Sequence, residues 1–193
     1  MLGKEHLVEA AKKLNIYPLI TKHNRAGKGA GVHLFNDAEA LDTYVNSDSF
    51  EEPVDGITLL QEYIRPIDGR IRRSKFIGRK FLYTVSIDSS QGFELCPADE
   101  CQLPNVSDSK FKIIDPLDAQ QQADYERFLN DAHLDVAAVE WVEDAQHRKF
   151  VYDVNTNTNY NEQAEAEAQV FAHEHLAAYL DQVLKAHYVL AEI

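Results

Sequence analysis

The chain has 193 residues and a formal net charge of −13 at pH 7, and 45% of its residues are hydrophobic. This length can bury a core as one domain or as two small ones. The acidic balance argues against nucleic acid and against an anionic membrane as partners, because both require a basic surface. Since no apolar run approaches the roughly 20 residues of a membrane span, we expect a globular cytoplasmic protein.

The cysteine content supports the same compartment. The two cysteines, Cys96 and Cys101, fit a reducing cytosol better than a disulfide scaffold. A redox pair or half of a metal site is the alternative to two free thiols. A structural zinc site would need four ligands, and no second Cys/His pair has a suitable spacing.

The first third of the chain predicts two helices and three strands. Apolar residues at helical spacing indicate an amphipathic helix over residues 5–14. Strands are expected at 17–23, 32–35 and 57–64. A second helix is expected over 37–46, with Asn36 or Asp37 as its cap.

The rest of the chain predicts a sheet and two helices. Two strands fill residues 70–87 and join in a tight turn at 77–80. A short strand follows at 93–96, then a helix at 118–132, two further strands, and a helical tail over 162–190. The tail carries a regular apolar stripe that we expect to be buried, formed by Leu176, Leu180, Val183, Leu184 and Tyr188.

A seam at residues 64–68 divides these elements into a smaller lobe, 1–65, and a larger lobe, 66–193. The sequence therefore predicts an α+β protein of two lobes. A cleft between two such lobes is a usual position for a ligand.

Acidic residues occupy the last two predicted strands. Glu140 follows the apolar run 136–139, and Asp153 and Asn155 share one face of the next strand because side chains alternate. Two carboxylates and an amide are suitable ligands for Mg²⁺, which completes its octahedron with water and phosphate oxygens. The alternative is a hairpin with a solvated polar face, but burying a carboxylate in an apolar run without a partner is costly.

A lysine and a glycine-rich loop form the second element. Lys22 ends an apolar strand, and Gly27, Gly29 and Gly31 follow within nine residues, with Lys28 among them. Glycines let backbone amides approach phosphate oxygens, and a lysine supplies a point charge. The alternative is a surface turn with a solvated lysine. A P-loop is excluded, because Lys28 is followed by glycine and not by Ser or Thr.

The third element is the strand through Gln61, Glu62, Tyr63 and Ile64, which ends at the seam. Its backbone groups could bind an adenine edge, and Asp68 could accept from ribose hydroxyls. The alternative is an ordinary strand, since any strand that ends at a seam has a similar pattern. Arginines follow on the next strand at positions 70, 72 and 73. In an acidic protein such a cluster indicates a bound anion, or alternatively a salt-bridged strand face.

Taken in order, these elements resemble the ATP-grasp superfamily, and most closely its RimK-like carboxylate–amine ligases. The resemblance extends from the Lys22 strand to Asp153 and Asn155, over almost the whole chain. It implies the ATP-grasp fold, in which two α+β lobes with antiparallel sheets enclose a nucleotide cleft. It also implies ATP and Mg²⁺ as cofactors, with a small-molecule or peptide carboxylate and an amine as substrates. The sequence leaves a homo-oligomer open.

The resemblance assigns a role to each candidate residue. Lys22 would contact the α- and β-phosphates, and residues 27–31 would close over the γ-phosphate. The Gln61 carbonyl and the Ile64 amide would bind adenine, with Asp68 on the ribose. Arg73 would act on the transferred phosphoryl group, and the magnesium ligands would be Glu140, Asp153 and Asn155.

The sequence departs from the family pattern in three places. Asp153-x-Asn155 stands where Glu-x-Asn is more frequent, and family members carry an additional N-terminal domain, so we expect a minimal protein or a fragment. The polar run 155–161 replaces a small proline-containing turn, and its amides either contact substrate or cap the last helix. Two other functions stay open on the same fold: a nucleotide-binding module without catalysis, and an ATP-dependent kinase.

Overall fold

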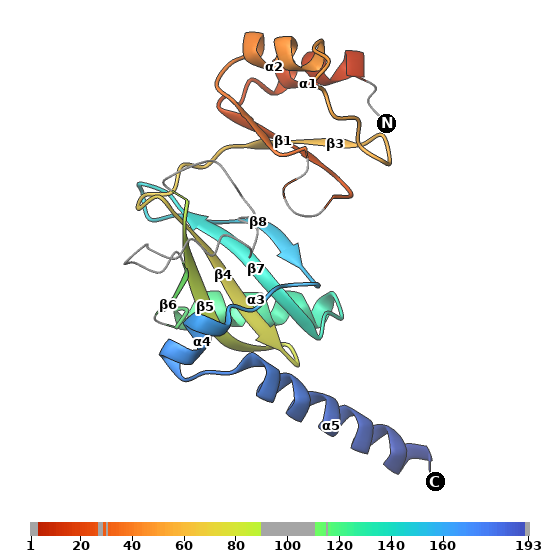
Figure 1. The fold of residues 1–193 in the computed structure, drawn as a ribbon, viewed down its shortest axis with the longest axis vertical. Coiled ribbons are helices and arrows are strands. Elements are labelled where there is room, and N and C mark those ends of the chain that lie inside the picture. The colour runs from red at the N-terminus through yellow and green to blue at the C-terminus, as the bar shows by residue number, and fades with distance from the viewer. Residues whose placement is uncertain (1–3, 27–28, 30, 90–110, 115, 192–193) are drawn as a thin grey trace. The chain divides into compact units, whose positions relative to one another are not determined.

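A computed structural model describes residues 4–26, 29, 31–89, 111–114 and 116–191 (Figure 1). These residues form an α+β structure with two antiparallel sheets, as the sequence predicts. They divide into two compact units, and the chain passes from the first to the second between Arg65 and Pro66. Each unit has a sheet and a hydrophobic core of its own.

The first unit is a three-stranded sheet with two helices on one face (Figure 1). In chain order its elements are α1 (Lys4–Leu14), β1 (Leu19–His23), β2 (His33–Phe35), α2 (Ala38–Val45) and β3 (Thr58–Glu62), and the strand order is β2-β1-β3. The buried core lies between the helices and the sheet and contains Leu7, Val8, Ala11, Leu19, Phe35, Leu41 and Val45. Asp37 is the N-cap of α2, because its side chain accepts a hydrogen bond from the Ala40 amide at 2.8 Å.

The second unit is built on a five-stranded sheet in the order β6-β5-β4-β7-β8. Its first six elements are β4 (Arg70–Ile77), β5 (Lys80–Asp88), β6 (Phe111–Ile114), α3 (Ala119–Asp131), β7 (Val136–Glu143) and β8 (Lys149–Asn155). One face of this sheet packs on α3, through a buried cluster of Phe76, Leu117, Leu129, Ala137, Val139 and Trp141. The other face carries the polar residues described below.

The hairpin between β4 and β5 has the turn that the sequence predicts. Gly78 and Arg79 both have positive φ, 59° and 64°. Two consecutive residues of this kind form the turn that matches the twist of paired strands, and glycine adopts it without strain.

The C-terminal segment is two helices, α4 (Glu162–Ala168) and α5 (Ala172–Ala191), and the prediction of one continuous helix is wrong. Gln169 takes the left-handed conformation at φ 55°, and the Val170 amide bonds back to the Glu165 carbonyl at 3.0 Å, which ends α4. The buried hydroxyl of Tyr83 donates to the Glu165 carboxylate and ties α4 to the sheet. Burial and this carboxylate raise the pKa of Tyr83.

The prediction that the apolar stripe of the last helix is buried is also wrong for most of its length. Leu180, Val183, Leu184 and Tyr188 are 45% to 66% exposed. Only the first half of α5 reaches the sheet, where the Tyr179 ring lies against Gly78, and the second half extends away from it (Figure 1).

Some predictions lie outside the residues that the structure describes: the strand at 93–96, Cys96, Cys101, Gly27 and Lys28. None of the helices that it does describe is long and apolar enough to cross a membrane.

Candidate functional site

Three neighbouring strands of the second unit bring the predicted catalytic and metal-binding residues onto one sheet face. Arg73 on β4 pairs with Glu140 on β7, and Glu140 pairs with Asp153 on β8. One step along, Ala138 pairs with Asn155. Side chains of directly paired residues point to the same face. The structure therefore gathers these polar residues on the face opposite α3, which we call the site face.

Arg73 and Glu140 form a buried ion pair in the middle of the site face. Their Nε and Oε1 atoms are 2.9 Å apart, and the residues are 8% and 4% exposed. Burial raises the pKa of Glu140 above its ordinary value, and the neighbouring Asp153 raises it further, while the Arg73 charge opposes both. Glu140 is thus a carboxylate held in place by a cation, with a second carboxylate close enough to affect its charge.

A β-bulge adds Tyr152 to this site, which sequence reasoning missed. The register shifts between Glu140, which pairs with Asp153, and Trp141, which pairs with Val151. Tyr152 and Asp153 therefore both lie opposite Glu140. The Tyr152 hydroxyl lies near the Glu140 carboxylate, and burial together with the charge of that carboxylate raises the pKa of Tyr152. Strict alternation along β8 predicts Tyr152 on the other face, so only the observed register reveals this contact.

The oxygen atoms on the site face fit a hard divalent cation. They come from the carboxylates of Glu140 and Asp153 and from the Asn155 amide, the donor types that Mg²⁺ prefers. Asn155 Oδ1 accepts from the Asn157 amide at 2.8 Å, which orients the side chain. Within the described part of the chain, no group of three or more His, Cys, Asp or Glu could hold a metal. The Asn155 amide is therefore the oxygen donor on this face that could join the two carboxylates around a cation.

Lys75 is a second residue that the sequence argument did not select. It lies two positions after Arg73, so both side chains share the site face, and it is only 1% exposed. Its Nζ donates to the Thr158 hydroxyl and to the Asn159 carbonyl and lies 5.0 Å from the centre of the Tyr160 ring. The sequence did contain one signal for Lys75: it lies two positions from Arg73 on the same predicted strand, so its side chain is expected on the same face.

The polar run 155–161 is used structurally at both of its ends. Asn161 Oδ1 accepts from the Ala164 amide at 2.8 Å and is the N-cap of α4, so the capping alternative is confirmed for Asn161. Asn155 closes the turn to Asn157. Between these ends lie the two residues that Lys75 contacts.

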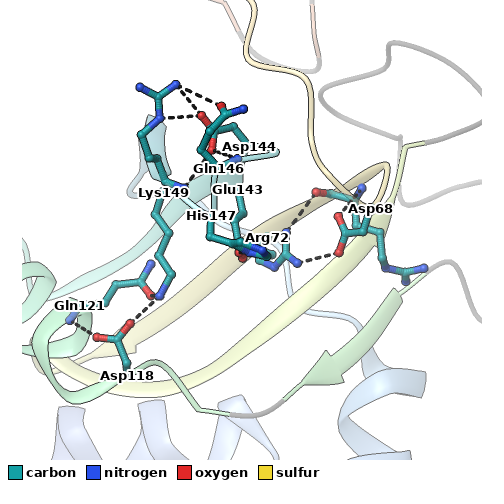
Figure 2. Close-up of polar contacts among 11 residues, drawn as sticks. Asp68, Arg72, Asp118, Gln121, Glu143, Asp144, Gln146, His147 and Lys149 are labelled. Atoms are coloured by element: carbon teal, nitrogen blue, oxygen red, sulfur yellow. Dashed lines mark hydrogen bonds and ion pairs between the residues drawn. The ribbon is translucent and has the colours of Figure 1, made fainter.

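The arginine cluster is split between the two faces of the sheet. Arg73 is on the site face, whereas Arg72 lies over the Trp141 ring at 5.2 Å. Arg72 also pairs with Asp68 at 2.6 Å (Figure 2). Arg70 contacts Asp88 at 3.7 Å. A salt-bridged strand face is therefore the correct interpretation for Arg70 and Arg72. The same pairing engages the carboxylate of Asp68, for which we predicted a contact with ribose.

Trp141 lies beneath a second cation on the same face. The Lys149 Nζ is 5.6 Å from the centre of the Trp141 ring. It also contacts Asp118 and Gln121, as Figure 2 shows. Trp141 is 4% exposed, and its indole donates to Ser74 Oγ at 2.9 Å. These contacts identify Trp141 as a core residue.

In the first unit, Lys22 lies on the face of β1 that points away from the helices. Leu19 belongs to the core beneath α1 and α2, and strand alternation turns Lys22 to the opposite side. Lys22 is half-buried and pairs with Leu59 of β3. Its assignment to phosphate stays a prediction.

The hydrogen bonding of β3 bears on the expected adenine contacts. The Asn24 amide bonds to the Ile57 carbonyl at 3.0 Å, and the Tyr63 amide to the Pro18 carbonyl at 2.9 Å. Bonded and non-bonded pairs alternate along antiparallel strands, so Gln61 is bonded to its partner Ile20 on β1. The backbone groups of residues 62 and 64 point away from β1. The pairing therefore favours the Glu62 carbonyl over the Gln61 carbonyl as the group available at this edge.

Gly31 anchors the end of the glycine-rich loop. Its φ is 69°, and a Cβ atom would lie 2.2 Å from the His23 ring, so any other residue would be strained here and would displace that ring. Its amide donates to Glu51 Oε2 at 3.2 Å, and its carbonyl accepts from Thr21 Oγ1 at 3.3 Å. Gly29 also has positive φ, 75°, and open space around it. The need for glycine is structural at residue 31, and the phosphate-binding role of the loop stays a prediction.

Comparison by sequence finds neither a matching family model nor a matching characterised protein. Comparison by structure finds ATP-grasp ligases. A RimK-domain ATP-grasp protein from Sphaerobacter thermophilus aligns over 93% of this chain with a TM-score of 0.64 and 19% identity. PsnB, an ATP-grasp ligase solved with a precursor variant, Mg and ADP, aligns over 91% with a TM-score of 0.60 and 15% identity. D-cycloserine synthetase DcsG aligns over 82% with a TM-score of 0.61 and 12% identity.

These alignments cover 58%, 50% and 54% of the three larger chains, so this chain spans about half of their length. Identities at this level show the fold alone. The fold that the resemblance implied is confirmed: the chain has the ATP-grasp fold.

Proposed function

Because the chain has the ATP-grasp fold, we propose that it is an ATP- and Mg²⁺-dependent ligase that joins a carboxylate to an amine. The observation that carries the proposal is the row of Arg73, Glu140, Asp153 and Asn155 on one sheet face. A cation, two carboxylates and an amide oxygen are the groups that phosphoryl transfer requires around a triphosphate.

In the proposed reaction a carboxylate oxygen of the substrate attacks the γ-phosphorus of ATP, and ADP leaves. The amine then attacks the carbonyl carbon of the acyl phosphate, and phosphate leaves as the amide forms. Neither step needs a nucleophile from the protein. The protein has to position the reactants and stabilise the developing negative charge.

The site face supplies groups for both tasks. Glu140, Asp153 and Asn155 would hold Mg²⁺, which neutralises charge on the phosphate oxygens when it is bound. Arg73 is fixed by its contact with Glu140 at 2.9 Å, so its remaining guanidinium donors have a defined direction. We assign Arg73 to the transferred phosphoryl group, where rigid donors cost no reorganisation.

We assign nucleotide binding to the first unit. Lys22 would contact phosphate, and the glycine-rich loop would offer its amides to the same group. At the edge of β3, the Glu62 carbonyl and the Ile64 amide would bind the adenine edge, since both point away from β1. We also propose Asp68, in the second unit, as the ribose contact; its carboxylate accepts from Arg72 and keeps further lone pairs for a hydroxyl.

For the substrates we propose a peptide carboxylate and an amine. PsnB is described in complex with a precursor peptide, and macrocyclase MdnC is described bound to a precursor peptide. Those descriptions apply to the two enzymes, and they support a peptide as the first substrate to test here.

The deciding experiment combines binding and chemical trapping. Calorimetry with Mg²⁺ and a non-hydrolysable ATP analogue should show binding that Asp153→Asn weakens. Incubation with ATP, Mg²⁺, hydroxylamine and peptides that contain Asp or Glu should yield a hydroxamate together with ADP, because hydroxylamine intercepts an acyl phosphate. Nucleotide binding without ADP formation would favour the non-catalytic module, and a stable phosphorylated peptide would favour the kinase.

A further inference from the structure

Lys75 has an environment that ordinary packing does not require. It is almost fully buried on β4, although lysine is seldom buried unless its charge is matched by donor–acceptor contacts. Its ammonium group reaches the Thr158 hydroxyl, the Asn159 carbonyl and the face of the Tyr160 ring. These three groups belong to the segment that directly follows β8.

Lys75 and Asn155 lie in line across the sheet, with one residue of β7 between them. Ala138 of β7 is the direct partner of Lys75 on one side and of Asn155 on the other. Ala138 is fully buried and contributes only a methyl group. The four-carbon stem of Lys75 therefore has room to pass over it toward the segment beyond Asn155.

Contacts at both ends and in the middle hold the segment after β8. At its start, Asn155 Oδ1 accepts from the Asn157 amide at 2.8 Å. At its end, Asn161 caps α4. Lys75 supplies the contact in the middle. An amide oxygen has two lone pairs, so the turn at Asn155 leaves one of them for a cation.

We propose that Lys75 is a positioning residue for the cation site: by holding Thr158 and Asn159, it fixes the turn at Asn155 and hence the amide oxygen beside Glu140 and Asp153. This inference rests on the cation site of the proposed function. The inference extends the proposed function, because it makes the cation affinity depend on a residue that is not itself a ligand of the cation. Groups that orient metal ligands typically change metal affinity 10- to 100-fold when they are removed.

The experiment compares three variants of the full chain with wild type. Lys75→Met keeps a side chain of similar length but removes the positive charge and the hydrogen-bond donors. Lys75→Arg keeps the charge and the donors. Lys80→Met is the matched control, because Lys80 lies on the same hairpin but is exposed, where it pairs with Glu126. The first measurement is the affinity for Mn²⁺, followed by electron paramagnetic resonance in the presence of a non-hydrolysable ATP analogue. The second is amide hydrogen exchange of the protein without ligand.

We expect Lys75→Met to speed exchange at residues 156–161 and to weaken Mn²⁺ binding on the order of tenfold. Lys75→Arg should recover part of the Mn²⁺ affinity, and Lys80→Met should match wild type. Exchange within α3 reports whether the fold is kept. If Lys75→Met does not fold, Thr158→Val tests the same contact from the other side, and it should shift both readouts in the same direction.

Two results would overturn the inference. Wild-type Mn²⁺ affinity in a folded Lys75→Met or Thr158→Val variant would show that the cation site does not depend on this contact. Unchanged exchange at residues 156–161 would show that Lys75 does not hold the segment. If wild type itself bound no Mn²⁺, the metal assignment of the proposed function would fail together with this inference. Equal binding by wild type and variant would overturn the inference alone.

Discussion

Arg73 Nε lies 2.9 Å from Glu140 Oε1 across β4 and β7, and both residues are more than nine-tenths buried. Two charges removed from water depend on each other, because either one alone would be buried without compensation. Glu140 of this pair also lies opposite Asp153 on β8. The contribution of the ion pair to stability and its proposed role at the cation site can be measured in separate experiments.

The first prediction concerns this ion pair. Arg73→Met should lower the free energy of unfolding by about 3–5 kcal/mol, because it leaves the Glu140 carboxylate buried without its cation. Adding Glu140→Gln should recover much of that loss, since the unpaired charge is then gone. Urea unfolding of both single variants and the double variant measures the coupling. Additive losses would mean that the two side chains do not interact.

The second prediction concerns the metal ligands. Asp153 is exposed and accepts from the neighbouring Val154 amide at 3.0 Å, so Asp153→Asn should leave the stability within about 0.5 kcal/mol of wild type. The same change should weaken Mg²⁺-dependent ATP binding, because one of two carboxylates is lost. Calorimetry with and without Mg²⁺ makes the comparison, and Asp124→Asn on the exposed side of α3 is the control. Equal Mg²⁺-dependent binding in all three proteins would remove Asp153 from the site.

The third prediction concerns Lys22. Lys22→Ala should weaken ATP binding more than adenosine binding, by about 1.5–3 kcal/mol for the loss of a charge-assisted contact to phosphate. Titration of both ligands against both proteins gives the difference. Equal losses for ATP and adenosine would place Lys22 outside the phosphate site.

The fourth prediction concerns pH. The Lys149 ammonium, followed by the Gln121 amide, lowers the pKa of Asp118 below its ordinary value of 3.8. A lowered pKa in the folded state means that the ionised carboxylate adds stability above pH 3.8, and that this contribution is lost as the pH falls through the folded value. Asp118→Asn keeps a good helix cap but removes the charge. Its stability deficit relative to wild type should therefore be present at pH 7 and should shrink below pH 3.8 in thermal unfolding, whereas a constant deficit would argue against the ion pair.

The fifth prediction compares two leucines. Leu184→Ala in the exposed half of α5 should change stability by less than about 0.5 kcal/mol. Leu129→Ala should cost about 2–5 kcal/mol, because Leu129 is fully buried beneath the second sheet. Chemical denaturation of both variants tests the contrast, and a large loss at Leu184 would show that this face is covered in solution.

Several features follow from local sequence alone. The side-chain period of a strand is two, so Asp153 and Asn155 share a face in any sheet that contains them. Asp37 caps a helix because a carboxylate before a helical run accepts an amide of the first turn. The turn at Gly78 is equally local, since the residue type permits the required φ. These are properties of a few consecutive residues.

Other features depend on which strands pair and in what register. The bulge that brings Tyr152 to Glu140, the passage of Lys75 over Ala138, and the orientation of the Gln61 carbonyl all arise from pairing between distant segments. Periodicity likewise marked an apolar stripe in α5, but it does not report whether another element covers that stripe. The sequence by itself determined the strands, the caps and the residue types of the site. The tertiary structure decided which of those residues meet, because register and packing partners are set by contacts across the chain.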